Sequence, residues 1–381
     1  MEGTQVEKSA ESISSTGLGA LLFMFLMGSS MTVPLAAIAG HDAWISIILA
    51  LAVSSGIVWI YTRLCLHYPG KSLVEIAREL LGAWGGGIMA LLYAWYALHL
   101  GSLVLRNFTE LINTVALQRT PPFVVSAVMI GMVLWAAYGG IEVIARCALA
   151  LIWFVLSEGI VSMLLMSKDF QAANLLPVVD RGWMPILEGM TELVGFPFGE
   201  SVLFAMIIPA LNRIGQANKT MLRTLFAAGA LLIMVNIRNF LILGDMASKL
   251  VFPSYTAYQY ISLADFIERV EPILIITWLM GGFSKISVCL YVCAKSLSAG
   301  MASTHYRPYL VPMGLLMLEF SLFVHRNNAE QIQFAVRVWQ WYSFPFQIAV
   351  PLALLMLASF AKRKREPPPD GLAAAGGVKG E

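Results

Sequence analysis

Charged residues are scarce in this chain of 381 residues. Asp, Glu, Lys and Arg make up only 13% of it, whereas 58% of the residues are hydrophobic and the mean hydropathy is +0.74. Soluble globular domains carry about 25% charged residues, so the composition excludes that class and indicates a multi-pass membrane protein in contact with lipid. The net charge of +2 is too small to favour nucleic acid as a partner.

Cysteine and histidine are also few, at four and five residues. Cys65, Cys147, Cys289 and Cys293 lie in or beside apolar segments, where cysteine packs as a small apolar residue. Cys289 and Cys293 are four positions apart, but no third ligand follows nearby, so we predict no metal site. The sequence also lacks a Walker loop, a dinucleotide-binding glycine pattern and a nucleophile triad, and we therefore expect no cofactor and no enzymatic activity.

Long apolar runs are what the sequence does have. A membrane-spanning helix needs about twenty apolar residues, and this criterion predicts about ten spans. They cover residues 17–39, 44–64, 85–112, 122–138, 143–166, 186–211, 222–243, 273–294, 309–324 and 344–360. The first run is too long for a cleavable signal peptide, so we expect it to stay as an anchor. Residues 72–81 combine a short apolar stripe with charges on the other face, which predicts a helix at the membrane surface.

Lys and Arg are concentrated in alternate loops, which predicts that both termini are cytoplasmic. We expect a cytoplasmic segment over 1–16, a transmembrane domain over 17–361, and a basic, then disordered, cytoplasmic tail over 362–381. The outer loops 167–185 and 244–270 are longer than the others. The second is either a lid over a cavity, a docking surface or a plain connector, and the sequence does not decide among these.

Two of the predicted spans contain helix-breaking residues. Gly28, Ser29 and Ser30 interrupt the first span, and the sequence from Gly195 to Glu200 interrupts the sixth. Proline lacks an N–H and glycine packs poorly, so backbone groups should be left unpaired at a depth where lipid cannot satisfy them. Paired interruptions in two halves of a chain are typical of an inverted-repeat transporter core, here with five helices in each repeat.

A small ligand would suit these interruptions. Free N–H groups at a half-helix end favour a carboxylate, and unwound carbonyl groups favour an ammonium, so we expect a zwitterion such as an amino acid. The predicted ligand-binding residues are Gly28, Ser29, Ser30, Gly195, Phe196, Pro197, Gly199 and Glu200, with Tyr93 and Phe283 as walls. An alternative interpretation is that the small residues only permit close helix packing.

Ionisable residues inside apolar spans are costly and therefore mark function or specific pairing. Glu200 stands next to the second interruption, where it either contacts the ligand or a proton, or holds the kink. Glu158 and Lys285 are possible partners, and Glu319 completes a possible buried charge network. His99 is isolated on an apolar face, which favours a packed core histidine over a proton relay.

Four stretches together carry a family resemblance: PLAAIAGHDAW at 34–44, YPGKSLVEI at 68–76, TPP at 120–122 and YGGIEVIAR at 138–146. The chain resembles the B-subunit family of bacterial spore germinant receptors, a branch of the amino acid, polyamine and organocation (APC) permease superfamily, over about residues 15–361. The resemblance implies an all-α LeuT/APC-like fold and a location in the cell membrane or spore inner membrane. It also implies a small germinant, often an amino acid, and A-type and C-type subunits as partners.

Three functional hypotheses follow. The first is a nutrient-sensing receptor subunit that triggers spore germination, and the second is an amino acid or amine permease, either a proton-coupled symporter or an exchanger. The third is a channel or scaffold with a vestigial pocket. Some proton-coupled relatives in the superfamily place a lysine in the fifth span, where this chain has Glu158; this difference favours sensing over proton-coupled transport.

Overall fold

The computed structural model describes residues 11–259, 271–303 and 305–365, and within these ranges the chain is almost entirely helical. The α-helices are α1 (Ser15–Met27), α2 (Ala43–His67), α3 (Leu73–Val115), α4 (Pro122–Tyr138), α5 (Ile141–Met166), α6 (Trp183–Leu193), α7 (Ala217–Leu243), α8 (Pro253–Tyr258), α9 (Glu271–Gly300), α10 (Arg307–Phe323), α11 (Asn328–Arg337), α12 (Trp339–Phe344) and α13 (Val350–Arg365). Short 3-10 or π turns are η1 (Ser29–Met31), η2 (Ala37–Asp42), η3 (Ser167–Asp169), η4 (Ala172–Leu175), η5 (Val194–Phe198), η6 (Gly199–Met206), η7 (Ile208–Ala210), η8 (Ile214–Gln216), η9 (Gly244–Ser248) and η10 (Pro345–Ala349).

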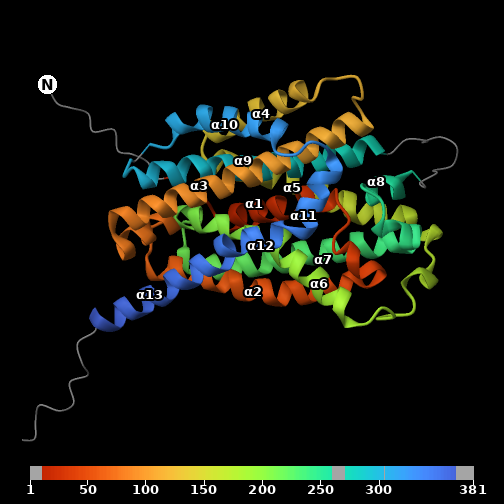
Figure 1. The fold of residues 1–381 in the computed structure, drawn as a ribbon, viewed down its shortest axis with the longest axis horizontal. Helices are drawn as coiled ribbons and strands as arrows, with labels where there is room; N and C mark the ends of the chain where they lie inside the picture. The colour runs from red at the N-terminus through yellow and green to blue at the C-terminus, as the bar shows by residue number, and fades with distance from the viewer. Residues whose placement is uncertain (1–10, 260–270, 304, 366–381) are drawn as a thin grey trace, which may run out of the picture.

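The long helices run side by side, with α1 near the middle of the bundle (Figure 1). α1 packs against α5, α7 and α9, and residues 20–30 are all buried. A helix that is hydrophobic all round is stable only when neighbours cover every face, which explains why this apolar segment occupies the centre. The first interruption therefore lies in the interior of the protein.

Six helical segments in the described ranges are long and apolar enough to cross a membrane, and α4 and the α1 region are shorter apolar helices. Helical segments occupy each of the ten predicted stretches, and the first and sixth are divided by their breaks. The tenth is one continuous helix over Trp339–Ala361, with the π turn η10 between α12 and α13. Pro345 starts this extra π turn, since proline cannot supply the N–H that a continuous α-helix needs.

The short helix predicted over 72–81 is present as the first part of α3. It starts at a capping box in which Ser72 N–H donates to Glu75 Oε2 at 2.7 Å. The chain leaves helical geometry at Gly82, with φ 78°, and then resumes a helix that forms the third span. Glycine adopts this φ without steric cost, so Gly82 separates the short helix from the span that follows.

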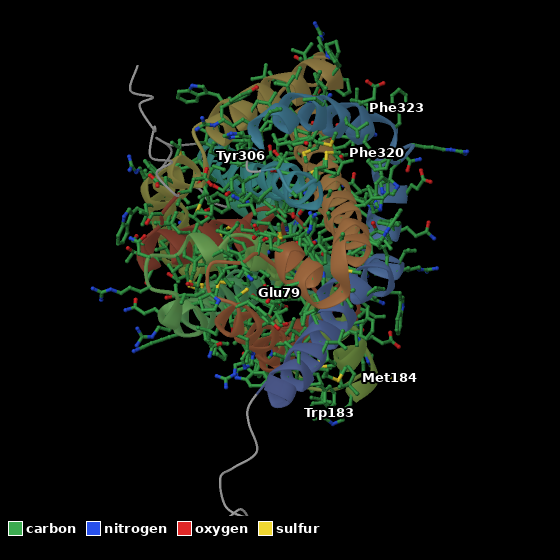
Figure 2. The ribbon with its side chains drawn as sticks, turned by 90° about the vertical axis from the view of Figure 1, so that its left-hand side faces the viewer. Glu79, Trp183, Met184, Tyr306, Phe320 and Phe323 are labelled. Atoms are coloured by element: carbon green, nitrogen blue, oxygen red, sulfur yellow. The ribbon has the colours of Figure 1, made fainter. Side chains whose placement is uncertain are left out.

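The long loops contain short helices. Residues 167–185 include η3 and η4, and the loop after α7 includes η9 and α8. The stretch 260–270, which the sequence analysis included in the second loop, lies outside the described residues, as do residues 1–10 and 366–381 of the predicted terminal segments. Apolar side chains cover the outside of the bundle, as lipid contact requires; Trp183, Met184 and Phe323 are 58%, 67% and 74% exposed (Figure 2).

One end of the bundle is held by the start of the chain. Ile13 N–H donates to the Ala210 carbonyl at 2.8 Å, and Asn212 N–H donates to the Ile13 carbonyl at 3.0 Å. The Glu11 carboxylate accepts hydrogen bonds from the hydroxyls of Tyr291 and Tyr306, at 2.7 and 2.6 Å. Helix α7, about 40 Å long at 1.5 Å per residue, separates this end from the loop that contains η9.

Candidate functional site: a pocket beside a buried ion pair

The first break occurs at Gly28, where α1 stops with φ −27° and ψ −101°. A Cβ atom at this position would lie 2.9 Å from Lys285 Cδ, and one at Gly281 would lie 3.1 Å from Gly28 Cα. Because α9 approaches so closely, Gly28 serves helix packing, as the alternative interpretation of the sequence proposed. The same close approach brings the Lys285 side chain to the end of α1.

The second break extends over η5. Phe196 leaves helical geometry with φ −146° and ψ 123°, and the Phe196–Pro197 peptide bond is cis. The chain then continues as the 3-10 turn η6. The predicted interruptions of the first and sixth spans are thus both present.

Neighbouring protein groups satisfy part of the backbone at the second break. The Gly195 carbonyl accepts hydrogen bonds from Gln347 Nε2 at 2.7 Å and from Trp339 Nε1 at 3.3 Å. Gln347 also donates to the Tyr96 hydroxyl at 2.9 Å. The tenth span therefore supports the interrupted sixth, and the Gly195 carbonyl is not free for a ligand.

An ion pair lies between the two breaks. Lys285 Nζ on α9 is 2.6 Å from Glu200 Oε2 on η6, and both side chains are 0% exposed. The ammonium also donates to Ser29 Oγ at 3.3 Å, and it lies 4.8 Å from the centre of the Phe196 ring. One cation thus links η1, η5, η6 and α9. Each charge would be strongly unfavourable alone in this interior, so each depends on the other.

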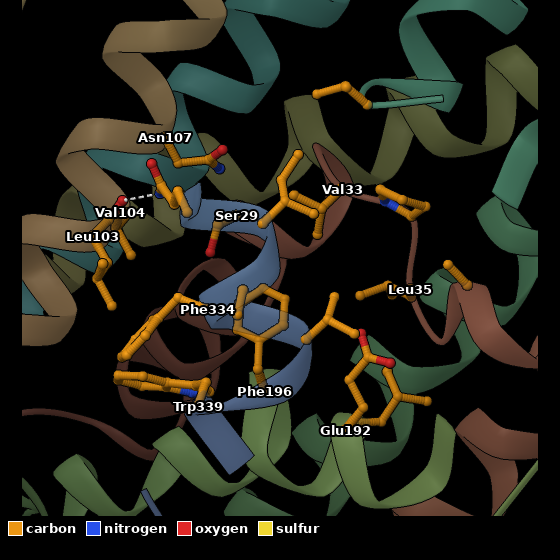
Figure 3. Close-up of a pocket in the computed structure, with 18 of the residues that line it drawn as sticks. Ser29, Val33, Leu35, Leu103, Val104, Asn107, Glu192, Phe196, Phe334 and Trp339 are labelled. Atoms are coloured by element: carbon orange, nitrogen blue, oxygen red, sulfur yellow. Dashed lines mark hydrogen bonds between the residues drawn. The ribbon is translucent and has the colours of Figure 1, made fainter. Parts of the chain in front are cut away.

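A pocket of about 220 Å³ opens beside this pair (Figure 3). Its wall consists of segments far apart in the chain, namely the two breaks, the middle of α3, the end of α6, the loop after η9, and α11 with α12. The lining includes Ser29, Val33, Leu35, Leu103, Val104, Asn107, Glu192, Phe196, Glu200, Lys249, Val251, Gln331, Phe334 and Trp339. Most of these side chains are apolar or aromatic, with a few polar groups, which is typical of small-molecule sites.

The ionisable groups of the pocket are Glu192, Glu200 and Lys249. Glu200 Oε1 and Gln331 Oε1 are buried without a hydrogen-bond partner among the described residues. Because Lys285 already neutralises Glu200, what these unpaired oxygens give the pocket is a preference for hydrogen-bond donors. An ammonium group matches this preference.

The structure brings some predicted site residues to the pocket and places others behind it. Ser29, Phe196 and Glu200 line the pocket, whereas Gly28, Gly195, Pro197 and Gly199 are buried in the backbone turns, and Ser30 lines a small neighbouring cavity. Tyr93 faces the tenth span instead, donating its hydroxyl to the Phe346 carbonyl at 2.7 Å. Phe283 is half-buried on α9 and is not part of the pocket wall.

Several lining residues were not predicted. Glu192 stands before the second break, and its position in the same span as Glu200 was a usable signal. Phe334 on α11 and the residues after η9 had no such signal, because no apolar span contains them and only tertiary folding brings them to the pocket.

The pairing of Glu158 with Lys285, which the sequence left open, does not form, since Lys285 pairs with Glu200. Glu158 on α5 faces Arg238 on α7 at 3.9 Å and accepts a hydrogen bond from the Tyr258 hydroxyl on α8. The Glu158 and Arg238 side chains are 3% and 1% exposed. Two separate buried pairs therefore replace the single predicted network. Glu319 joins neither, because it lies on the exposed face of α10.

Comparisons with known proteins agree with this architecture. A family model described as "Spore germination protein" matches residues 12–329. Spore germination protein KB of Bacillus subtilis is 30% identical over 359 residues, covering 93% of this chain and 96% of that protein. Spore germination protein A2 of the same organism is 25% identical over 333 residues, covering 84% and 87%.

Solved transporter structures share the fold. A Na⁺-coupled sialic acid symporter in a substrate-bound outward-open state superposes with a TM-score of 0.67 at 10% identity, covering 95% of this chain and 92% of that one. MhsT in complex with L-phenylalanine superposes with a TM-score of 0.60 at 11% identity, covering 91% and 88%. The predicted LeuT-like, APC-type fold is thereby confirmed. The family model and the 30% identical relative establish that the chain belongs to the spore germination protein family, as a multi-pass membrane B-type subunit, and the solved structures show its transporter-like fold.

Proposed function

We propose that this subunit senses a small nutrient germinant, an amino acid with an apolar side chain, in the pocket between the two breaks. The observation that carries the proposal is the buried Lys285–Glu200 pair, which joins both interrupted spans to α9 and has one oxygen, Glu200 Oε1, without a partner among the described residues. Enzyme activity forms no part of this function.

Size and polarity support the choice of ligand. A volume of about 220 Å³ is below the roughly 300–1,000 Å³ of pockets for drug-sized ligands. The carboxylates of Glu192 and Glu200 suit an ammonium group, Ser29 and Lys249 suit a carboxylate, and the wall of leucine, valine and aromatic side chains suits an apolar side chain.

Ligand binding would change the balance between conformations through the ion pair. An ammonium that contacts Glu200 competes with Lys285, and the Lys285 side chain packs directly on Gly28. A ligand shifts such an equilibrium only by its difference in affinity for the two conformations, and a contact to one member of a buried pair supplies such a difference. The movement would reach A-type and C-type subunits in the membrane. In this arrangement the chain lies in the cell membrane or spore inner membrane with both termini in the cytoplasm.

The test combines ligand binding and germination. Purified protein is screened with amino acids by thermal shift, and spores with Glu200→Gln are compared with spores carrying Glu319→Gln. We expect Glu200→Gln to reduce both ligand stabilisation and germination rate by tenfold or more, and Glu319→Gln to change neither, because Glu319 is exposed on α10. Equal effects of the two substitutions would remove Glu200 from the site.

Transport of the ligand is a second candidate function. At one end of the helix bundle, the pocket reaches the loop after η9. At the other end of the bundle, the segment 11–14 packs against residues 210–212. Alternating access requires a ligand site that is open to one side of the membrane at a time. Uptake of a labelled amino acid into proteoliposomes by this chain alone would favour a permease. Binding without uptake, together with germination that requires the A-type and C-type subunits, would favour the receptor.

A further inference from the structure

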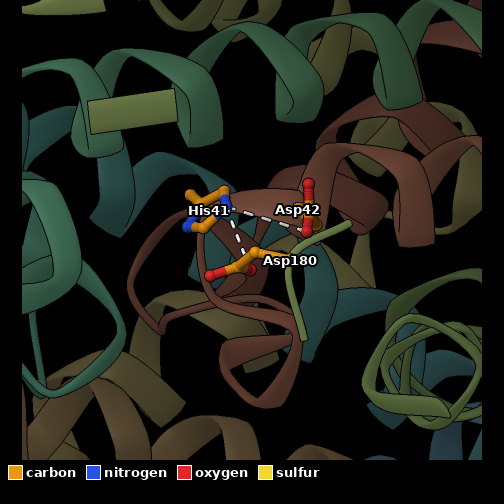
Figure 4. Close-up of side chains that lie close together, drawn as sticks. All are labelled: His41, Asp42 and Asp180. Carbon is orange, nitrogen blue, oxygen red and sulfur yellow. Dashed lines mark ion pairs between the residues drawn. The ribbon is translucent and has the colours of Figure 1, made fainter. Parts of the chain in front are cut away.

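Three loops meet at His41, away from the pocket. His41 and Asp42 end η2, Asp180 lies between η4 and α6, and Asp245 belongs to η9. His41 Nε2 is 3.5 Å from Asp180 Oδ1 and 3.8 Å from Asp42 Oδ2, and the three side chains face one another from separate segments (Figure 4). We propose that His41, Asp42 and Asp180 bind a divalent transition-metal ion, with Zn²⁺ the best match.

The spacing of the ligand atoms suits such an ion. One nitrogen of His41 and one oxygen of each aspartate all lie within 4.8 Å of one another, in the only group of this kind that the described residues contain. Around a tetrahedral zinc with bonds of about 2.0–2.2 Å, neighbouring ligand atoms are about 3.4 Å apart. Side-chain rotations would have to bring the measured distances to that value. His41 Nε2 also donates a hydrogen bond to the Pro177 carbonyl at 2.9 Å, so a bound ion would take the place of that proton.

Asp42 provides a second and independent indication. Its carboxylate is only 2% exposed. Oδ2 accepts the Val179 N–H at 2.9 Å, but Oδ1 has no hydrogen-bond partner among the residues that the structure describes. A buried carboxylate oxygen without a donor is unfavourable. Oδ2 is the oxygen that faces His41, so a cation bound by both oxygens of Asp42 would remove the deficit.

The charges around the cluster also favour a dication. Among the described residues, the ion pairs of this cluster join Asp42, Asp180 and Asp245 to His41, and join Asp245 to Arg181, whose Nη2 is 3.5 Å from Asp245 Oδ2. A dication would add positive charge beside the buried Asp42 carboxylate. Zn²⁺ accepts imidazole and carboxylate together, whereas Ca²⁺ and Mg²⁺ prefer oxygen ligands alone.

Asp245 has the position of a supporting residue. Its Oδ1 is 4.0 Å from His41 Nδ1, on the side of the ring opposite Asp42 and Asp180. A metal-bound histidine usually donates its other N–H to a carboxylate, which fixes the tautomer that leaves the ligand nitrogen free. The ion would thus connect η2, the loop before α6 and η9, and Ser248 at the end of η9 lines the ligand pocket. Metal binding would therefore stiffen the entrance to the pocket.

The experiment uses the full chain, without a histidine tag, in lipid nanodiscs, and Zn²⁺ alone as the probe. Equilibrium dialysis at buffered free Zn²⁺ measures affinity and stoichiometry. We expect one ion per chain, with binding at least about tenfold weaker in Asp180→Asn and in His41→Gln. Asp169→Asn, an exposed aspartate in the same loop, is the matched control and should bind as the unaltered chain does.

Trypsin provides a second readout. Cleavage after Arg181 should become slower on addition of Zn²⁺ in the unaltered chain and in Asp169→Asn, but not in Asp180→Asn. Ca²⁺ should give no such protection. The proposal is overturned if the unaltered chain binds no Zn²⁺, if all four proteins bind it equally, or if Ca²⁺ protects the unaltered chain and His41→Gln alike.

Discussion

The Lys285–Glu200 pair allows a quantitative test of how the interior is held together. Replacing Lys285 by Met leaves the Glu200 carboxylate uncompensated at 0% exposure. Breaking a buried pair from one side costs about 3–5 kcal/mol, whereas replacing both members together is often nearly neutral. We therefore expect Lys285→Met to lower the unfolding free energy by about 3–5 kcal/mol, a factor of at least about 100 in the folding equilibrium constant. Lys285→Met with Glu200→Gln should recover most of that loss.

The assay is reversible unfolding in mixed micelles. Lys71→Met is the control, since its pair with Glu79 is exposed, at 48% and 33%, and exposed pairs contribute at most about 1 kcal/mol. The reasoning fails if Lys285→Met costs no more than Lys71→Met. It also fails if the double substitution costs the sum of the two single ones, because the two charges would then be independent.

Two further predictions concern the break and the second pair. A side chain at Gly199 would place its Cβ 2.5 Å from the Val194 carbonyl oxygen and still closer to Gln347. We therefore expect Gly199→Leu to abolish the germination response while membrane insertion persists. The control is Gly87→Leu, at a position where an added Cβ meets no atom within 4 Å, and it should leave the response intact. Arg238→Met leaves Glu158 buried without its cation, and we expect a loss of about 3–5 kcal/mol in the same unfolding assay. An Arg238→Met protein as stable as the unaltered chain would show that the Tyr258 hydroxyl alone suffices for Glu158.

The spans and their breaks could be predicted because they depend on local properties. Apolar length defines a span, and the glycine and proline residues near position 197 prevent a continuous helix whatever surrounds them. The family resemblance added the repeat architecture, and the structural comparisons confirm it.

Pairing and pocket composition could not be predicted in the same way. Nothing local distinguishes Glu158 from Glu200 as the partner of Lys285, because the choice depends on how α9 packs against η6 rather than against α5. The Tyr93 hydroxyl donates its hydrogen bond to a carbonyl in the π turn of the tenth span. The length of an apolar run does not reveal such a turn. Phe334 belongs to a short polar helix, and its place in the wall follows from tertiary folding alone.

The attachment of the chain start has a practical consequence for measuring motion. Ile13 is held between Ala210 and Asn212 by backbone hydrogen bonds, and its side chain is buried at 3% exposure. Paired spectroscopic labels at the exposed neighbours Thr16 and Arg213 would report on separation at this end without touching the ligand pocket. A bulky fusion joined directly before Glu11 would crowd the two tyrosines that bind it, so proteins prepared for such measurements should carry their tags at the other terminus.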